Sequence, residues 1–139
     1  HTYANDAANT YGVNNDGTLL IVAETMTKSL WAYDIISPGK VENKRLWATH
    51  PDDGLGPDGM DFDTAGNLLV AHWGGSSIDV FDPSGALIER IKTPFEKPSN
   101  VHFGGPDRRD IYITEHDENG LWLLESWKHQ GQLQYCDRG

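Results

Sequence analysis

The sequence contains one cysteine, Cys136, so no disulfide can form within the chain and the fold does not depend on an oxidising compartment. No apolar run approaches the roughly 20 residues that a membrane-spanning helix needs, and we expect no membrane partner. Basic residues are scarce: 11 lysines and arginines stand against 21 aspartates and glutamates, a formal net charge of −10. That charge repels phosphate backbones, so we also expect no nucleic-acid partner. No signal peptide is visible, and we expect a cytoplasmic protein, although the chain begins at His1 rather than at Met.

The residues that are present indicate a globular protein made of strands. Hydrophobic residues make up 37% of the chain, and 139 residues is an ordinary length for one domain. No window carries the 3.6-residue apolar period of a long capped helix. Short apolar runs alternate instead with turns such as Asn15-Asp16-Gly17 and Asp82-Pro83-Ser84-Gly85. We therefore predict an all-β fold.

One pattern of turn, strand, turn and strand occurs three times along the chain. Its clearest copy covers residues 55–75, and weaker copies precede and follow it. Aligning the copies places Asn9, Asp58 and Asn100 at one equivalent position, with spacings of 49 (58 minus 9) and 42 (100 minus 58) residues. Repeats of 40 to 50 residues or so that contain four short strands are typical of β-propeller blades.

We therefore predict a single half-propeller domain over residues 1–139, with three four-stranded blades at about 8–50, 56–93 and 98–136. The expected strands are 10–14, 19–24, 29–33 and 44–49, then 59–63, 68–73, 77–81 and 87–92, then 101–103, 111–115, 120–124 and 132–136. Three blades form an open arc with two exposed faces and unpaired edges. Such an arc invites association.

The equivalent residues of the three repeats are the candidate site. The innermost strand of a propeller blade begins beside the central channel, so Asn9, Asp58 and Asn100 can point into it. Their carboxylate and amide oxygens are hard ligands that suit Ca²⁺ or Mg²⁺. The alternative is that Pro57-Asp58-Gly59 is a plain turn, where aspartate is common because it hydrogen-bonds its own backbone.

Other ionisable residues carry no recognisable motif. We expect His72 and His102 in the core or the channel wall, because apolar residues surround them in the sequence. Glu24 and Glu115 end second strands and are expected in solvent. The remaining histidines that we assign to loops are His50, His116 and His129. No Gly-rich phosphate loop, zinc-binding cysteine pair or Gly-x-Ser-x-Gly elbow occurs.

Several motifs together resemble those of one known family. They are Leu30-Trp31-Ala32-Tyr33-Asp34, Pro57-Asp58-Gly59-Met60, Gly66-Asn67-Leu68, Trp73-Gly74-Gly75, Phe81-Asp82-Pro83 and Phe103-Gly104-Gly105-Pro106-Asp107. This set looks like the gluconolactonase, regucalcin and luciferin-regenerating-enzyme family. The resemblance runs from about residue 8 to residue 132 and corresponds to the C-terminal half of the family's sequence.

The resemblance implies a fold, a cofactor and an activity. Members of that family are six-bladed propellers that hold a divalent cation in the channel and hydrolyse sugar lactones or similar esters. It implies that Asn9 and Asp58 bind the cation, with Asp58 also the catalytic acid or base, and we add Asn100 as a third ligand. Ca²⁺ is the ion we expect, with Mg²⁺, Mn²⁺ and Zn²⁺ as alternatives. The family's glutamate ligand and its asparagine in the third blade have no counterpart here.

Two functions follow as hypotheses. The first is a metal-dependent lactone or ester hydrolase of the gluconolactonase type that acts on a small molecule. The second is a non-catalytic binding or scaffold protein with the same fold, which the missing glutamate favours. A half-gene product without activity of its own is a third reading.

Finally, we predict a homodimer in which two three-bladed arcs close one six-bladed ring around a two-fold axis. Residues 1–6 then supply the outer strand of the partner's last blade. The partner's Asn100 takes the place of the asparagine that the chain lacks.

Overall fold

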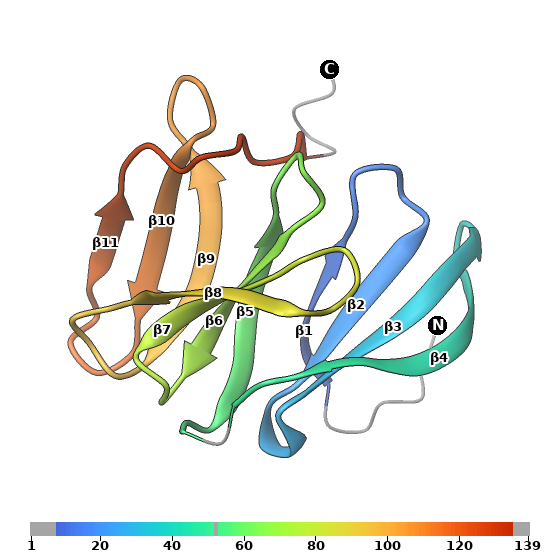
Figure 1. Cartoon of the computed structure of the whole chain (residues 1–139), viewed down its shortest axis with the longest axis horizontal. Helices are drawn as coiled ribbons and strands as arrows, with labels where there is room; N and C mark the ends of the chain where they lie inside the picture. Colours follow the sequence, from blue (N-terminus) through green and yellow to red (C-terminus); the bar gives the residue numbers. More distant parts are fainter. Residues whose placement is uncertain (1–7, 52, 135–139) are drawn as a thin grey trace.

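The computed structural model describes residues 8–51 and 53–134, which form three antiparallel sheets in chain order (Figure 1). The first sheet contains β1 (Ala8–Val13), β2 (Leu19–Glu24), β3 (Ser29–Ser37) and β4 (Lys40–Thr49), with a 3₁₀ turn, η1 (Thr25–Thr27), between β2 and β3. The second contains β5 (Gly56–Phe62), β6 (Leu68–Trp73), β7 (Ser77–Phe81) and β8 (Leu87–Lys92). The third contains β9 (Pro98–Gly104), β10 (Asp110–Glu115) and β11 (Leu121–Leu124). We call these sheets blade 1, blade 2 and blade 3.

The all-β prediction is confirmed, and blades 1 and 2 have the four strands expected of them. Blade 3 has three strands among the described residues. We predicted a fourth strand that starts at residue 132, but residues 132–134 are not part of a strand. Cys136, at the end of that predicted strand, lies outside the described residues. The chain after β11 instead crosses to blade 2, where Gly131 bridges Asp63 and the Gln132 amide donates to the Phe62 carbonyl over 3.0 Å (Figure 1).

The core lies between the blades rather than inside any one of them. One face of blade 1, with Ile21 and Leu30 at 0% exposure, packs against Phe62 and Val70 of blade 2. The opposite face of blade 2 packs against blade 3 through a second cluster, which includes Leu69, Ala71, Ile78, Val80, Val101, Ile111 and Ile113. Burying a side chain of this size stabilises the fold by about 1.5–3 kcal/mol. Blade 2 is therefore covered on both faces, which explains why every residue of β7 and all but the last residue of β6 are buried.

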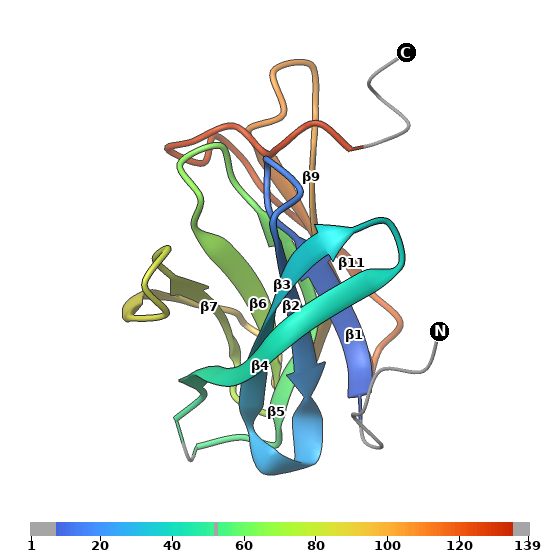
Figure 2. The same cartoon turned by 90° about the vertical axis from the view of Figure 1, so that its right-hand side faces the viewer.

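The first strands of the blades approach one another closely. β5 contacts both β1 and β9. A Cβ atom on Gly12 of β1 would lie 3.2 Å from the Met60 Cγ, and one on Gly59 of β5 would lie 2.6 Å from the Cα of Asn100 in β9. The missing side chains allow this approach, so β1, β5 and β9 form the inner wall of the arc. Figure 2 shows blade 1 in front, with its outer face turned toward the viewer.

No helix in the described part of the chain is long and apolar enough to cross a membrane.

Candidate functional site

The three positions aligned by the sequence repeat share one structural feature, a shift in strand register. In β1, Ala8 pairs with Glu24 and Thr10 with Ala23, which leaves Asn9 between them. In β5 the pairing shifts between Pro57 and Met60. In β9 it shifts beside Asn100, which pairs with Thr114 while the next pair is Glu115 with Pro98. Bulges of this kind turn side chains out of the regular alternation and are common beside active sites.

Asp58 and Asn100 therefore occupy neighbouring inner strands at the same level of the arc. Asp58 is half-buried, and the next residue, Gly59, presses its bare backbone against Asn100. Asn100 is exposed, and its Oδ1 accepts a hydrogen bond from the Val101 amide at 2.9 Å. Asn9 lies in β1, which packs beside β5, but the position of its side chain lies outside what the structure describes.

The backbone that carries Asp58 is fixed from the blade 1 side. Thr25 Oγ1 donates a hydrogen bond to the Pro57 carbonyl over 2.7 Å. Gly56 has a φ of 139° and packs against the Thr25 carbonyl, so a larger residue is strained there and has no room. On the other edge, Gly56 and Pro57 pair with the last two residues of β6, Trp73 and His72. Asp58 thus follows a segment that cannot shift easily.

Asp58 and Asn100 offer the type of ligand atom that a hard cation binds, but they offer too few of them. The Asp58 carboxylate and the Asn100 amide oxygen are the oxygen ligands that Ca²⁺ and Mg²⁺ prefer. Ca²⁺ takes six to eight oxygen ligands, and the Asn100 oxygen already accepts one amide proton. Asp58 and Asn100 would therefore fill only part of the coordination sphere of such an ion.

An aromatic pair lies at the end of blade 2 where β5 begins and β6 ends. Trp73, which pairs with Gly56 two residues before Asp58, stacks on His116 with ring centroids 5.6 Å apart and planes at 29°. Lys97 lies 5.8 Å from the Trp73 ring centroid, and its backbone carbonyl accepts the His116 amide at 3.1 Å. His116 is in a loop, as we expected. Its stacking partner could not be read from the sequence, because the two residues are 43 positions apart (116 minus 73).

Asp61 of β5 forms a hydrogen bond to the inner strand β9. We did not identify it as a candidate residue from the sequence. Its buried carboxylate accepts hydrogen bonds from the Phe62 amide at 2.9 Å, the Phe103 amide at 3.0 Å and Gln134 Nε2 at 3.1 Å. Nδ1 of His102 lies 3.1 Å from the same carboxylate, although 60% of the His102 side chain is exposed. His102 is therefore a wall residue, one of the two places we expected for it.

A second polar cluster is buried where β6 and β7 meet blade 1. Asp79 of β7 is completely buried, and each of its carboxylate oxygens has two partners. Oδ1 accepts hydrogen bonds from Ser77 Oγ at 2.7 Å and from Arg90 Nε at 2.9 Å. Oδ2 lies 2.9 Å from Nδ1 of His50 and 3.0 Å from Nδ1 of His72. We call these five residues the buried network.

Three members of the buried network, His50, His72 and Asp79, are close enough to share a metal ion, because one ligand atom of each lies within 4.8 Å of the others. A carboxylate has about four lone-pair sites, and the contacts of Asp79 occupy all of them. Arg90 also supplies the positive charge that a metal would bring. The arrangement is therefore better suited to a hydrogen-bonded ion pair than to a cation.

The buried network also holds the loop that precedes Asp58. Arg90 Nη1 donates a hydrogen bond to Asp53 over 2.7 Å, and this bond keeps the pKa of Asp53 below its usual range and that of Arg90 above its own. Burial acts to raise the pKa of Asp79, but its four hydrogen bonds outweigh burial and hold that pKa far below its usual range. Burial lowers the pKa of His50, so its ring is neutral near pH 7.

From the sequence we expected His72 in the core or the channel wall and His50 in a loop. His72 is fully buried, as expected, and His50 follows β4 but is also buried. The prediction that Glu115 lies in solvent is wrong. Its carboxylate is buried and accepts hydrogen bonds from the amides of the turn after β10, at 3.0 Å from Asp117, 2.8 Å from Glu118 and 2.9 Å from Gly120.

Comparisons with known proteins agree with this architecture. A family model described as the SMP-30/gluconolactonase/LRE-like region matches residues 4–117. A diisopropyl-fluorophosphatase of Loligo vulgaris is 53% identical over 127 residues, which cover 88% of this chain and 40% of that protein. A pentonolactonase of Haloferax volcanii is 32% identical over 108 residues, 76% of this chain and 37% of that protein.

Solved structures show the same fold. A luciferin-regenerating enzyme superimposes with a TM-score of 0.82 at 24% identity, over 94% of this chain and 48% of that one. A gluconolactonase of Xanthomonas campestris superimposes with a TM-score of 0.74 at 30% identity, over 86% of this chain and 37% of that one. The chain thus spans less than half the length of the relatives it matches.

Proposed function

The chain belongs to the SMP-30/gluconolactonase/LRE-like family, and on that premise we propose that it forms part of the channel site of a metal-dependent lactone or ester hydrolase. The observation that carries the proposal is that Asp58 lies in a bulge of β5 directly before Gly59, whose backbone packs against Asn100, and that Asn9 lies in a bulge of the adjacent strand β1. The names of the relatives agree with it, since a lactonase and a fluorophosphatase both promote attack of water on an electrophilic centre.

In this proposal, Asn9, Asp58 and Asn100 hold a divalent cation, with Ca²⁺ preferred for an all-oxygen set. When bound, such a cation polarises the substrate carbonyl and stabilises negative charge that develops on its oxygen. Asp58 is the one carboxylate among the three, so it is the residue that orients or deprotonates the attacking water.

The test is hydrolysis of a panel of aldonolactones and of a phosphofluoridate, with and without a chelator. We expect turnover that EDTA abolishes and Ca²⁺ restores. Asp58→Asn keeps the shape but removes the base and the charge, and we expect a loss of at least about 100-fold. Glu42→Gln is the matched control, because Glu42 is an exposed carboxylate of β4 that forms a surface ion pair with Lys40. A full rate in EDTA, or an equal loss in the two variants, would exclude this mechanism.

A non-catalytic binding protein is the second candidate. The observation in its favour is that two of the three equivalent positions are asparagine, so one chain presents a single carboxylate to the cation. Calorimetry distinguishes the two functions. Ca²⁺ binding that Asp58→Asn removes, combined with no turnover on either class of substrate, would establish the binding protein and exclude the enzyme.

A further inference from the structure

The turn between β10 and β11 contains a chemically labile pair of residues. Asn119 and Gly120 form the one Asn-Gly step in the sequence. Asparagine is among the thermally labile residues, and a following glycine has no side chain to keep its backbone nitrogen away from the asparagine side chain. Asn119 is exposed, and its φ of 55° lies in the left-handed region that asparagine tolerates. The turn therefore presents an asparagine that can react with its own backbone.

The reaction is a ring closure followed by hydrolysis. The backbone nitrogen of Gly120 bonds to the side-chain carbonyl carbon of Asn119 and gives up its proton, while the bond from that carbon to the side-chain nitrogen breaks and ammonia leaves. The product is a five-membered succinimide ring. Water then opens the ring at either of its carbonyl groups and yields aspartate or isoaspartate. One water is consumed and one ammonia is released, so no oxidant or reductant is needed.

Glu115, the last residue of β10, holds the nitrogen that must attack. Its buried carboxylate accepts the amide protons of Gly120 at 2.9 Å, Asp117 at 3.0 Å and Glu118 at 2.8 Å. The Glu115 amide in turn donates to the Gly120 carbonyl over 3.1 Å. Because an amide bound to Glu115 keeps both its proton and its position, ring closure requires the turn to open first. Hydrogen bonds to a charged acceptor resist such opening more strongly than bonds to a neutral one.

We infer that Asn119 is a modification site at which aspartate and isoaspartate form, and that Glu115 sets the rate by controlling how often the turn opens. The rate in the folded protein is then the rate of the unfolded chain multiplied by the fraction of time for which the Gly120 amide is free. Neither a cation nor a substrate takes part, so the reaction is independent of the proposed hydrolase.

Conversion changes the turn that carries His116. Aspartate at position 119 adds a negative charge beside the three acidic residues of 115–118, and isoaspartate also inserts a methylene group into the backbone. The spacing that lets one carboxylate bind amides along the whole turn is then lost. His116 stacks on Trp73 with ring centroids 5.6 Å apart, and we expect this stack to loosen when the turn is modified.

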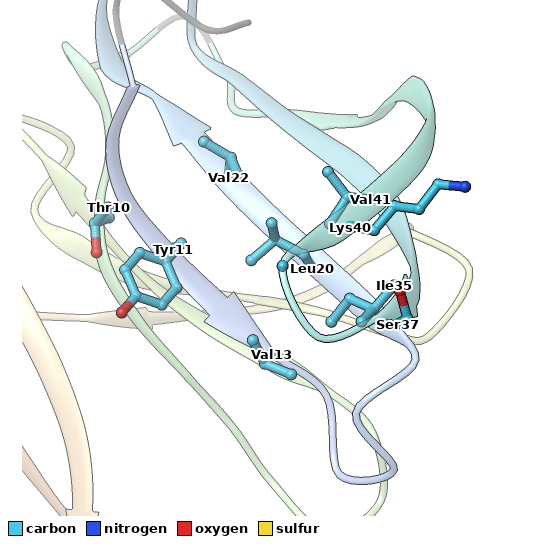
Figure 3. A pocket seen from close by; sticks show the side chains of 10 residues that line it. Thr10, Tyr11, Val13, Leu20, Val22, Ile35, Ser37, Lys40 and Val41 are labelled. Atoms are coloured by element: carbon cyan, nitrogen blue, oxygen red, sulfur yellow. The ribbon is translucent and has the colours of Figure 1, made fainter. Parts of the chain in front are cut away.

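Asn43 provides a matched comparison within the same chain. It is also exposed, its φ is 56°, and it lies in β4 two residues after Val41, which lines a pocket on blade 1 (Figure 3). The next residue, Lys44, carries a side chain that hinders ring closure, and the side-chain nitrogen of Asn43 donates to Asp34 over 2.8 Å. Asn43 should therefore stay intact under conditions that convert Asn119.

The test is incubation of the full chain at neutral pH, with conversion at each asparagine followed by peptide mass spectrometry and isoaspartate measured by enzymatic methylation. We expect conversion at Asn119 to be at least about tenfold slower in the folded protein than in urea, the factor that one charge-assisted hydrogen bond contributes to an opening equilibrium. The Gly120 amide should be protected from hydrogen exchange by a similar factor. The ring resonances of His116 should shift in step with conversion.

Glu115→Gln keeps the shape of the side chain but removes its charge, and it should abolish most of the difference between the folded and the urea-treated protein. Asp117→Asn is the matched control, because it removes a carboxylate from the same turn without touching the Glu115 acceptor, and it should convert at the wild-type rate. Equal rates in folded and urea-treated wild type would overturn the inference. Slower conversion in Glu115→Gln would also overturn it, because Glu115 would then act as a base.

Circular dichroism establishes whether Glu115→Gln folds. If it does not, the wild type alone decides, through the comparison of Gly120 exchange with Asn119 conversion. Protection from exchange that matches the slowing of conversion supports the role of Glu115, and protection without slowing refutes it.

Discussion

Removing Arg90 should be among the most damaging single changes in this chain, because it leaves a buried carboxylate without its counter-charge. Arg90→Gln removes the bonds to Asp79 and Asp53, while Asp79 stays fully buried. Breaking one side of a buried ion pair typically costs about 3–5 kcal/mol. We take the lower end, about 3 kcal/mol, because the Arg90 side chain is 23% exposed and His50 and His72 still contact Asp79.

The cost should depend on pH, with a sign that follows from the histidines. His50 has a pKa in the fold below its unfolded value of about 6.5, so only the unfolded wild-type chain takes up its proton there. The wild type therefore loses stability as the pH falls below about 6.5. Arg90 itself contributes to lowering the His50 pKa, and its removal allows a histidine proton to replace the lost charge beside Asp79. The penalty of Arg90→Gln should be largest near pH 8 and smaller near pH 6.

Urea denaturation of wild type and variant at about pH 6 and pH 8 measures both effects. Asp79→Asn and the double variant complete a mutant cycle, in which the double variant should be more stable than Arg90→Gln alone. Lys128→Gln is the control for a surface ion pair, since Lys128 and Glu89 are 51% and 39% exposed, and it should cost about 0–1 kcal/mol. If Arg90→Gln costs no more than this control at pH 8, the buried network does not contribute as described.

Three further changes test the geometry around Asp58. Gly59→Ala should cost about 1–3 kcal/mol in urea denaturation, because its Cβ meets the backbone of Asn100 at 2.6 Å, whereas a Cβ on Gly12 meets only side chains, of Met60 and Phe62, at 3.2 Å or more, and Gly12→Ala should cost less. Thr25→Val should cost about 1 kcal/mol in the same assay by removing the bond to the Pro57 carbonyl. Trp73→Leu should shift the ring resonances of His116 in NMR spectra while leaving the fold intact, and unchanged resonances would exclude the stack.

The strands could be predicted because their signals are local. The alternation of β10 and the turns that separate the strands lie within a few residues of each other, and every element of blade 2 was placed within three residues. The hairpin of β3 and β4 was predicted too short. Both strands continue to a tight turn at Gly39, which has a φ of 78°, through residues such as Ile35 and Val41, which pair with each other across the hairpin.

The candidate positions remain a prediction, and they follow from the repeat, which aligns them. Nothing in the sequence indicates that the register shifts at each of them, because a bulge depends on the partner strand. The buried network could not be predicted from the sequence either. Asp79 sits in an alternating strand where a polar residue normally faces solvent, and only the packing of blade 1 over blade 2 places it inside.

The last two residues of β6 connect the buried network to the candidate site. Successive residues in a strand point to opposite faces, so His72 reaches toward blade 1 and His50, whereas Trp73 reaches toward blade 3 and His116. Pro57 and Gly56 pair with these same two residues, directly before the bulge that carries Asp58. The segment that carries Asp58 is therefore tied to both neighbouring blades, and a disturbance on either face of blade 2 can reach it through His72 or Trp73, in addition to the direct contacts with Thr25 and Asn100.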